Sequence, residues 1–223
     1  MFVRLLATVA ASAALAGCSV FGVRSGTEQV DYEVVERLGE DLEVRRYPAR
    51  VAAEARVPVE RVDDGQGRAF RLLFYYIKGA NDGGREIAMT APVETGPGET
   101  DPAGAEIAMT APVQTGTDRS AEGTRQVTMR FFLPADHTAD SAPVPTHPRV
   151  RLLELPAETL AVLRFSGFGG RESVQQERRA VIDRLQDSAW TATGAPTALF
   201  YDPPWTLPFF RRNEVAVPVA RRG

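Results

Sequence analysis

The chain has 223 residues, of which 43% are hydrophobic and 25% are charged, and its formal net charge is −3. That length is enough for one good hydrophobic core or two small ones. A weakly acidic chain has no overall attraction for nucleic acid, so the composition excludes a protein that binds nucleic acid through bulk positive charge.

The first residues are typical of an export signal and not of a folded domain. Arg4 is followed by an apolar run from Leu5 to Ala16, which is too short to span a membrane. The string Leu15-Ala16-Gly17-Cys18 resembles the lipobox of bacterial lipoproteins, in which the cysteine is acylated and becomes the mature N-terminus. The alternative is an ordinary signal peptide that is cleaved nearby. Ser19, in place of an aspartate, resembles the residue that favours sorting to the outer membrane.

We therefore expect a lipoprotein signal peptide over residues 1–17, lipidation at Cys18, a tether over residues 18–30 and one domain over residues 31–220. Cys18 is the only cysteine. Its lipidation would leave no thiol for catalysis, metal binding or a disulfide. The expected location is the cell envelope, where the lipid anchor would hold the protein at the periplasmic face of the outer membrane.

The periodicity of apolar residues predicts two groups of strands, each interrupted by a helix. The expected strands cover residues 32–37, 42–47, 50–59, 127–133, 150–155, 159–166, 197–201 and 213–219. The first helix, over residues 67–78, has apolar residues around most of its circumference, so it should be largely buried. The second helix is expected over residues 172–189, with Gly194 capping its end. Each half is small for a separate core, so the halves should form one continuous sheet or barrel.

An eleven-residue segment occurs twice, as Glu86–Gly96 and Glu106–Gly116, and the copies differ only at Glu94 and Gln114. The repeat is either a recent duplication or a pair of equivalent strands. Each copy offers a thioether and a hydroxyl but no acid–base pair. The repeat therefore favours a binding function over a catalytic one.

The side chains of the first copy should alternate if the segment is extended. Ile87, Met89 and Ala91 are then expected on one side of the strand. Pro92 cannot donate a hydrogen bond to a neighbouring strand, and neither can Pro112 in the second copy, so each copy should end at a sheet edge or a bulge.

The sequence contains no recognisable catalytic set. No serine lies in a Gly-x-Ser-x-Gly elbow, and Gly167-Phe168-Gly169 lacks the third glycine of a dinucleotide-binding fingerprint. His137 and His147 lie in a proline-rich loop, where they are either solvated histidines, a weak metal site or a residue that reaches a ligand. We expect that the protein is not an enzyme.

Three groups of residues are candidates for a binding site. Met89 and Met109 either fill the core or act as axial ligands of a haem iron. Phe70 and Phe74 either belong to the core or line a pocket. The pair Arg211-Arg212 either forms local ion pairs or clamps carboxylates through bidentate contacts.

Several motifs in a common order resemble those of the SOUL haem-binding family, over nearly the whole expected domain. They are Tyr32-Glu33-Val34, Arg46-Tyr47-Pro48, the helix end Tyr76–Asp82, Ile87–Val93 with its second copy, Met129–Pro134, Arg164–Gly167, Tyr201–Trp205 and Arg211–Val215. The resemblance implies an α+β fold: a distorted antiparallel β-barrel with two packed helices and an internal pseudo-twofold repeat.

The resemblance also implies that haem or a related tetrapyrrole binds in a hydrophobic cleft beside the first helix. The matching positions are Phe74 and Tyr75, to which helical spacing adds Phe70. Because no histidine precedes His137, the haem would be held by apolar stacking, by arginine contacts to its propionates, and by Met or Tyr.

Three functions follow as hypotheses. The first is a non-catalytic envelope lipoprotein that binds haem or a related tetrapyrrole. The second is a binding module for another amphipathic small molecule, since the implied fold also resembles the effector-binding domains of bacterial regulators. The third is an enzyme that acts on a tetrapyrrole or a lipid. The expected partners are the small molecule and the membrane, without nucleic acid.

Overall fold

The computed structural model describes residues 27–59, 62–97, 126–203 and 205–223. The expected signal peptide, Cys18, most of the expected tether, and the second copy of the repeat with Met109 lie outside these residues. The elements are β1 (Glu28–Gln29), β2 (Glu33–Arg37), β3 (Leu42–Tyr47), β4 (Arg50–Pro58), α2 (Val62–Ile77), β5 (Thr90–Ala91), β6 (Val93–Pro97), β7 (Gln126–Phe132), β8 (Val150–Leu155), β9 (Glu158–Phe165), α3 (Arg171–Gln186), β10 (Trp190–Ala192), β11 (Thr197–Phe200), the 3-10 turn η1 (Pro208–Phe210) and β12 (Asn213–Arg221).

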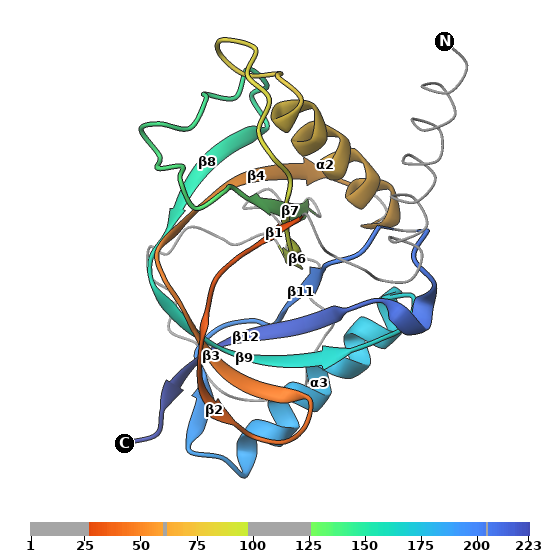
Figure 1. Cartoon of the computed structure of the whole chain (residues 1–223). Helices are drawn as coiled ribbons and strands as arrows, with labels where there is room; N and C mark the ends of the chain where they lie inside the picture. The colour runs from red at the N-terminus through yellow and green to blue at the C-terminus, as the bar shows by residue number, and fades with distance from the viewer. Residues whose placement is uncertain (1–26, 60–61, 98–125, 204) are drawn as a thin grey trace, which may run out of the picture.

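One curled antiparallel sheet holds nearly all the strands, in the order β2-β3-β9-β12-β11-β6-β7-β4-β8, and β10 pairs with β12 (Figure 1). The half β3-β9-β12-β11 corresponds strand by strand to the half β8-β4-β7-β6. In each half the second strand, β9 or β4, leads along the chain to a helix. The expected α+β fold, with a distorted antiparallel barrel, two packed helices and a pseudo-twofold repeat, is therefore confirmed. The barrel has the form of a curled half-barrel sheet, and its pseudo-axis lies between β11 and β6.

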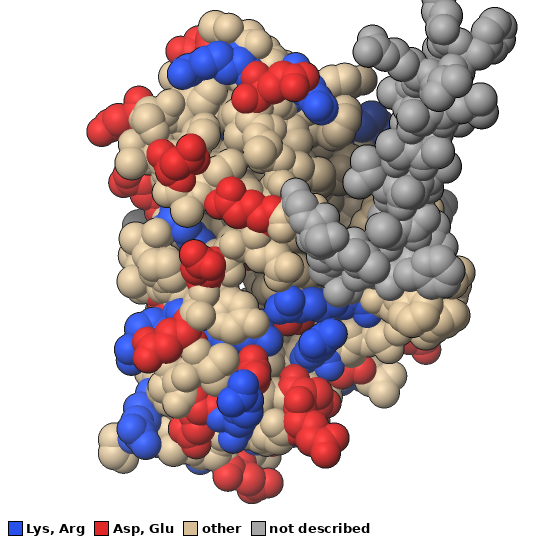
Figure 2. All heavy atoms as spheres, viewed as in Figure 1, with Lys and Arg blue, Asp and Glu red and all other residues tan. Residues whose placement is uncertain are grey.

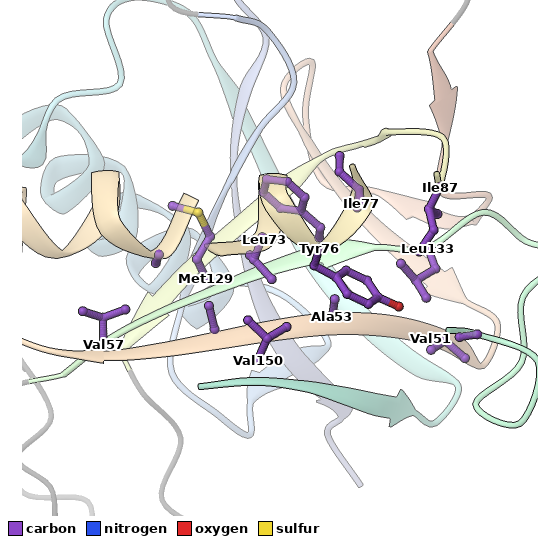
Figure 3. Close-up of a cluster of buried hydrophobic side chains, with 14 of the residues drawn as sticks. Val51, Ala53, Val57, Leu73, Tyr76, Ile77, Ile87, Met129, Leu133 and Val150 are labelled. Carbon is purple, nitrogen blue, oxygen red and sulfur yellow. The ribbon is translucent and has the colours of Figure 1, made fainter. Parts of the chain in front are cut away.

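Each helix covers one half of the sheet from the outside of the curl. Alternate residues of a strand point to opposite faces, so Ala53 and Ala55 of β4 contact α2, while Val215 and Val217 of β12 contact α3. Figure 3 shows α2 packed over β4, with Leu73 and Tyr76 directed toward the sheet. A third cluster, with Val162 and Leu199, lies on the opposite face. We call that opposite face of the sheet the inner face.

Several local expectations differ from the structure. The first helix begins earlier than expected, at Val62, and it is not largely buried, because the sheet covers only one of its sides. The second helix ends at Gln186, where Asp187 is the C-cap, so Gly194 does not cap it. Helical periodicity predicts that a helix is present, but it does not predict how much of the helix surface packs against the rest of the protein.

The first copy of the repeat is less regular than a strand. Residues 86–89 lie outside the strands, and Ile87 and Ala91 are buried while Met89 is exposed. Pro92 follows a cis peptide bond and separates β5 from β6, so the expected interruption at the proline is present. The proline separates β5, which belongs to a two-stranded sheet with β1, from β6, which lies between β11 and β7 in the main sheet.

Candidate functional site

The solvent-exposed surface of α2 carries the three aromatic residues expected at a ligand site. Phe70 and Phe74 are each 38% exposed, and Tyr75 is 59% exposed. Residues three or four apart share a side of a helix. The opposite side, which contacts the sheet, consists of Ala69, Leu73, Tyr76 and Ile77. Phe70 and Phe74 therefore lie together on one flank of the helix.

The rings of Phe70 and Phe74 form a fixed apolar surface. Their centroids are 6.1 Å apart and their planes differ by 15°. The Phe70 ring also meets the buried Phe131 ring of β7 edge-on, at 5.3 Å. Because Phe131 belongs to the core, this contact restrains Phe70 and, through stacking, its neighbour Phe74. A flat apolar molecule can lie against such a pair of nearly parallel rings.

Met89 lies near the C-terminal end of the same helix. The Ile87 N–H donates to the Ile77 carbonyl oxygen at 2.8 Å, which attaches the segment before Met89 to the last residue of α2. The Met89 side chain is 40% exposed. The structure therefore places an accessible thioether at the helix end that also carries Phe74 and Tyr75.

The proline-rich loop between β7 and β8 packs against this helix end, which sequence patterns did not reveal. The Tyr76 hydroxyl donates to the Pro143 carbonyl oxygen at 2.9 Å, and the Asp82 N–H donates to the Val144 carbonyl oxygen at 2.9 Å. His147 follows in this loop and is exposed, whereas His137 is hydrogen-bonded to Asp136. A loop without periodicity gives no signal for such a contact.

Arg211 and Arg212 belong to the half of the sheet that α3 covers. The Arg211 Nε donates to the Thr206 carbonyl oxygen at 2.7 Å. The Arg212 Nε donates to Glu214 Oε1 at 2.9 Å, and its guanidinium lies 3.9 Å from the centre of the Tyr201 ring. Arg212 therefore forms a local ion pair, while Arg211 donates to a backbone carbonyl oxygen, and the carboxylate clamp stays a prediction.

Two buried carboxylates organise the inner face of the sheet, and neither was among the predicted site residues. Glu54 of β4 is fully buried. It accepts hydrogen bonds from Arg56 at 2.7 Å, from Arg130 at 2.8 Å and from Arg151 at 2.9 Å. Arg130 also donates to Glu94 of β6 at 3.1 Å. A row of alternating charges thus crosses β8, β4, β7 and β6.

Glu214 has the corresponding role in the other half and is also fully buried. It accepts hydrogen bonds from Arg45 at 3.0 Å, from Arg212 at 2.9 Å and from the Tyr201 hydroxyl at 2.6 Å. Cross-strand register creates both clusters from residues distant in sequence. A charged residue between two apolar ones within a predicted strand, as at Glu54, was the only sequence signal.

The buried charges change the proton affinities of their neighbours. Burial opposes the charge on Glu54, but Arg130 and Arg56 outweigh it and hold its pKa below the ordinary value of 4.5. Burial raises the pKa of Tyr47 to about 12. Burial, together with the Glu214 carboxylate, raises the pKa of Tyr201 well above 10.0. These tyrosines therefore stay protonated at neutral pH, and Glu54 stays ionised.

The lowered pKa of Glu54 predicts a loss of stability in acid. Because the unfolded chain binds more protons than the folded chain between the two pKa values, stability rises with pH there. The ionised Glu54 gives its full contribution to stability above the unfolded pKa of 4.5. This contribution is lost as the pH falls through the folded pKa. We expect the free energy of unfolding in urea to decrease from about pH 5 to about pH 3. The Glu54→Gln chain should show a shallower decrease, and an equally steep one would assign the effect to other carboxylates.

Comparison with known proteins gives a family match and several similar folds. The sequence profile described as SOUL heme-binding protein matches residues 27–218. The C-terminal domain of EcmrR is 13% identical, with a TM-score of 0.56 over 85% of this chain and 98% of that chain. EcmrR in a complex with DNA is 13% identical, with a TM-score of 0.54 over 82% of this chain and 57% of that chain. An uncharacterized conserved protein from Listeria innocua is 13% identical, with a TM-score of 0.50 over 81% and 92%.

The two kinds of match carry different information. At 13% identity the structural similarities show the fold alone. No curated protein sequence matches this chain. The family match spans nearly all the described residues, including α2 and the charged inner face.

Proposed function

The chain belongs to the SOUL heme-binding protein family, and on that premise we propose that it is a non-catalytic, lipid-anchored envelope protein that binds haem or a related tetrapyrrole on the exposed side of α2. The observation that carries the proposal is the stacked pair Phe70 and Phe74, which is exposed to solvent yet held against the core through Phe131. Exposed paired aromatic rings are typical of sites that take up flat apolar ligands.

The residues on α2 fit a porphyrin, which is a flat apolar disc with carboxylates at one edge. Phe70 and Phe74 would contact the disc. Arg71 is exposed and lies three residues before Phe74, so it shares a side of the helix with Phe74 and would meet a propionate there. Lys78 is also exposed at the helix end and forms an ion pair with Glu86 at 3.6 Å. Apolar stacking with one or two charged contacts supports binding of modest affinity.

The iron would find few strong ligands in this region. Met89 and Tyr75 are exposed near the end of α2, and a thioether or a phenol oxygen can act as an axial ligand. Among the described residues, no group of three or more His, Cys, Asp or Glu side chains could hold a metal ion. A bound haem would supply a redox-active iron, and the protein would contribute an apolar surface and charged contacts.

The proposed location comes from the sequence before the described domain. Leu15-Ala16-Gly17-Cys18 supports lipidation, and Ser19 supports sorting to the outer membrane. None of the helices within the described ranges is long and apolar enough to cross a membrane. A lipid anchor at Cys18 is therefore our proposal for membrane attachment.

A second candidate is a binding module for another amphipathic small molecule. The observation that favours it is the surface itself, since paired phenyl rings contact any flat apolar molecule. Haem would then bind weakly and without saturation, and other apolar compounds would displace it.

Haem titration of the full chain tests the proposed function. We expect a saturable one-to-one change at the Soret band. Phe74→Ala should weaken haem binding by about tenfold, because it removes half of the stacked pair.

Phe168→Ala is the matched control, since Phe168 is also an exposed phenylalanine but lies in the loop before α3. It should leave the haem affinity unchanged. Linear uptake without saturation, equal in all three chains, would contradict haem binding at α2 and favour the second candidate.

A further inference from the structure

Two neighbouring loops carry a group of aromatic side chains that the haem site does not use. Phe168 lies between β9 and α3, while Trp205, Phe209 and Phe210 lie between β11 and β12. Their exposed fractions range from 42% to 77%. We call these four residues the aromatic ridge. In Figure 1 the loop between β11 and β12, in blue, projects beyond the ends of both strands.

Hydrogen bonds join the two loops into one unit. The Gly167 N–H donates to the Pro208 carbonyl oxygen at 2.8 Å, and the Asn213 side-chain amide donates to the Gly167 carbonyl oxygen at 3.1 Å. The Arg211 guanidinium lies 5.5 Å from the centre of the Phe168 ring. Gly167 and Gly169 have φ values of 109° and 64°, which favour glycine. The ridge is therefore held in shape by the fold.

The composition of the ridge suits the surface of a lipid bilayer. A group of exposed large apolar side chains usually marks a surface that another molecule covers. Tryptophan and phenylalanine partition into the boundary between head groups and acyl chains, and a neighbouring arginine can reach the phosphates. Arg211 directly follows Phe210 in the chain and lies beside the Phe168 ring. Exposed aromatic tips with an arginine beside them match the apolar and polar layers of a membrane surface.

The start of the domain lies near the ridge. Its position favours a membrane surface over a protein partner as what covers the ridge. The Arg212 Nη1 donates to the Gln29 side-chain oxygen at 3.1 Å. Gln29 is eleven residues after Cys18, and that length of chain reaches at most about 40 Å. A chain anchored at Cys18 therefore keeps the region of the domain around Arg212, which is near the ridge, within about 40 Å of the membrane. We propose that the aromatic ridge inserts into the surface of the membrane to which the chain is anchored.

The inference rests on the proposed lipid anchor, and it adds a second membrane contact with a separate readout. Scattered charges cover the face shown in Figure 2, where positive and negative side chains alternate without a large area of one sign. Burial of the four aromatic rings is the basis of the proposed contact.

The chain carries its own reporter, because it has two tryptophans in contrasting surroundings. Trp190 is buried and donates to Glu36 at 2.9 Å, whereas Trp205 is 64% exposed. The test uses the full acylated chain in phosphatidylcholine and phosphatidylglycerol vesicles that contain lipids spin-labelled near the head group. Trp205 emission should shift to shorter wavelength and be quenched by about half. A Trp205→Phe chain should lose this quenched component.

A Phe168→Ser, Phe209→Ser, Phe210→Ser chain should still float with the vesicles through its anchor, but its Trp205 emission should resemble that of free protein. Unquenched Trp205 in a wild-type chain that floats would overturn the proposal. A blue shift without quenching would also overturn it, in favour of a protein surface that covers the ridge. Flotation of a chain that combines Cys18→Ala with the three serine substitutions would contradict the anchor alone. Trp205 quenching would still decide whether the ridge inserts.

Discussion

Replacement of Glu54 by glutamine should lower the free energy of unfolding by about 3–5 kcal/mol, because it leaves buried arginine charge without its carboxylate partner. Glu54 is fully buried and binds Arg56, Arg130 and Arg151 within 2.9 Å. Arg130 is itself buried and also forms an ion pair with Glu94. A glutamine has the same size but no charge, so the loss is electrostatic and not a loss of packing.

Urea unfolding at neutral pH measures this difference, with Glu86→Gln as the matched control. Glu86 pairs with Lys78 at 3.6 Å, and its side chain is 72% exposed. An exposed pair of this kind contributes at most about 1 kcal/mol. Equal losses in the two variants would show that the inner-face cluster does not stabilise the fold more than a surface pair does.

The two clusters also show what sequence patterns predicted and what they did not. The strands at 42–47 and 127–133 were predicted within one residue of β3 and β7, because the apolar residue types and the alternation that indicate a strand are local properties of the sequence. The ion pair between Glu54 and Arg130 joins residues 76 positions apart. Its existence depends on β4 lying beside β7. The order of the strands depends on how the whole sheet assembles, so no local sequence pattern predicts which strands are neighbours.

The site on α2 was predicted in part for a related reason. The family resemblance implied Phe74 and Tyr75, and the spacing of four residues placed Phe70 on the same side as Phe74. The periodicity also predicted a largely buried helix, which is wrong because a sheet covers only one side of a helix packed on it. The ridge residues lie in loops, where apolar residues follow no period that would distinguish exposed from buried ones. Cys18 and Met109 stay predictions outside the described residues.

Leu73→Ala should destabilise the fold by about 2–5 kcal/mol, whereas Phe74→Ala should cost only about 1 kcal/mol. The two residues are adjacent in α2 but face opposite surroundings. Leu73 is fully buried in the cluster with Ala53 and Val150, as Figure 3 shows, and Phe74 lies on the exposed flank. Removal of the leucine side chain leaves a cavity between helix and sheet, since the backbone around it cannot close fully.

The same two substitutions should affect haem affinity in the opposite order, because Phe74→Ala should weaken haem binding more than Leu73→Ala does. A folded Leu73→Ala chain keeps Phe70 and Phe74 exposed, so its haem affinity should stay within about twofold of the wild type, while Phe74→Ala should lose about tenfold. Urea unfolding and Soret titration on the same preparations measure both properties. Parallel losses of stability and affinity in both variants would mean that haem uptake follows general loosening of the fold and not contact with the α2 surface. A larger loss of stability in Leu73→Ala together with a larger loss of haem affinity in Phe74→Ala would show that one side of α2 stabilises the core and another side binds haem.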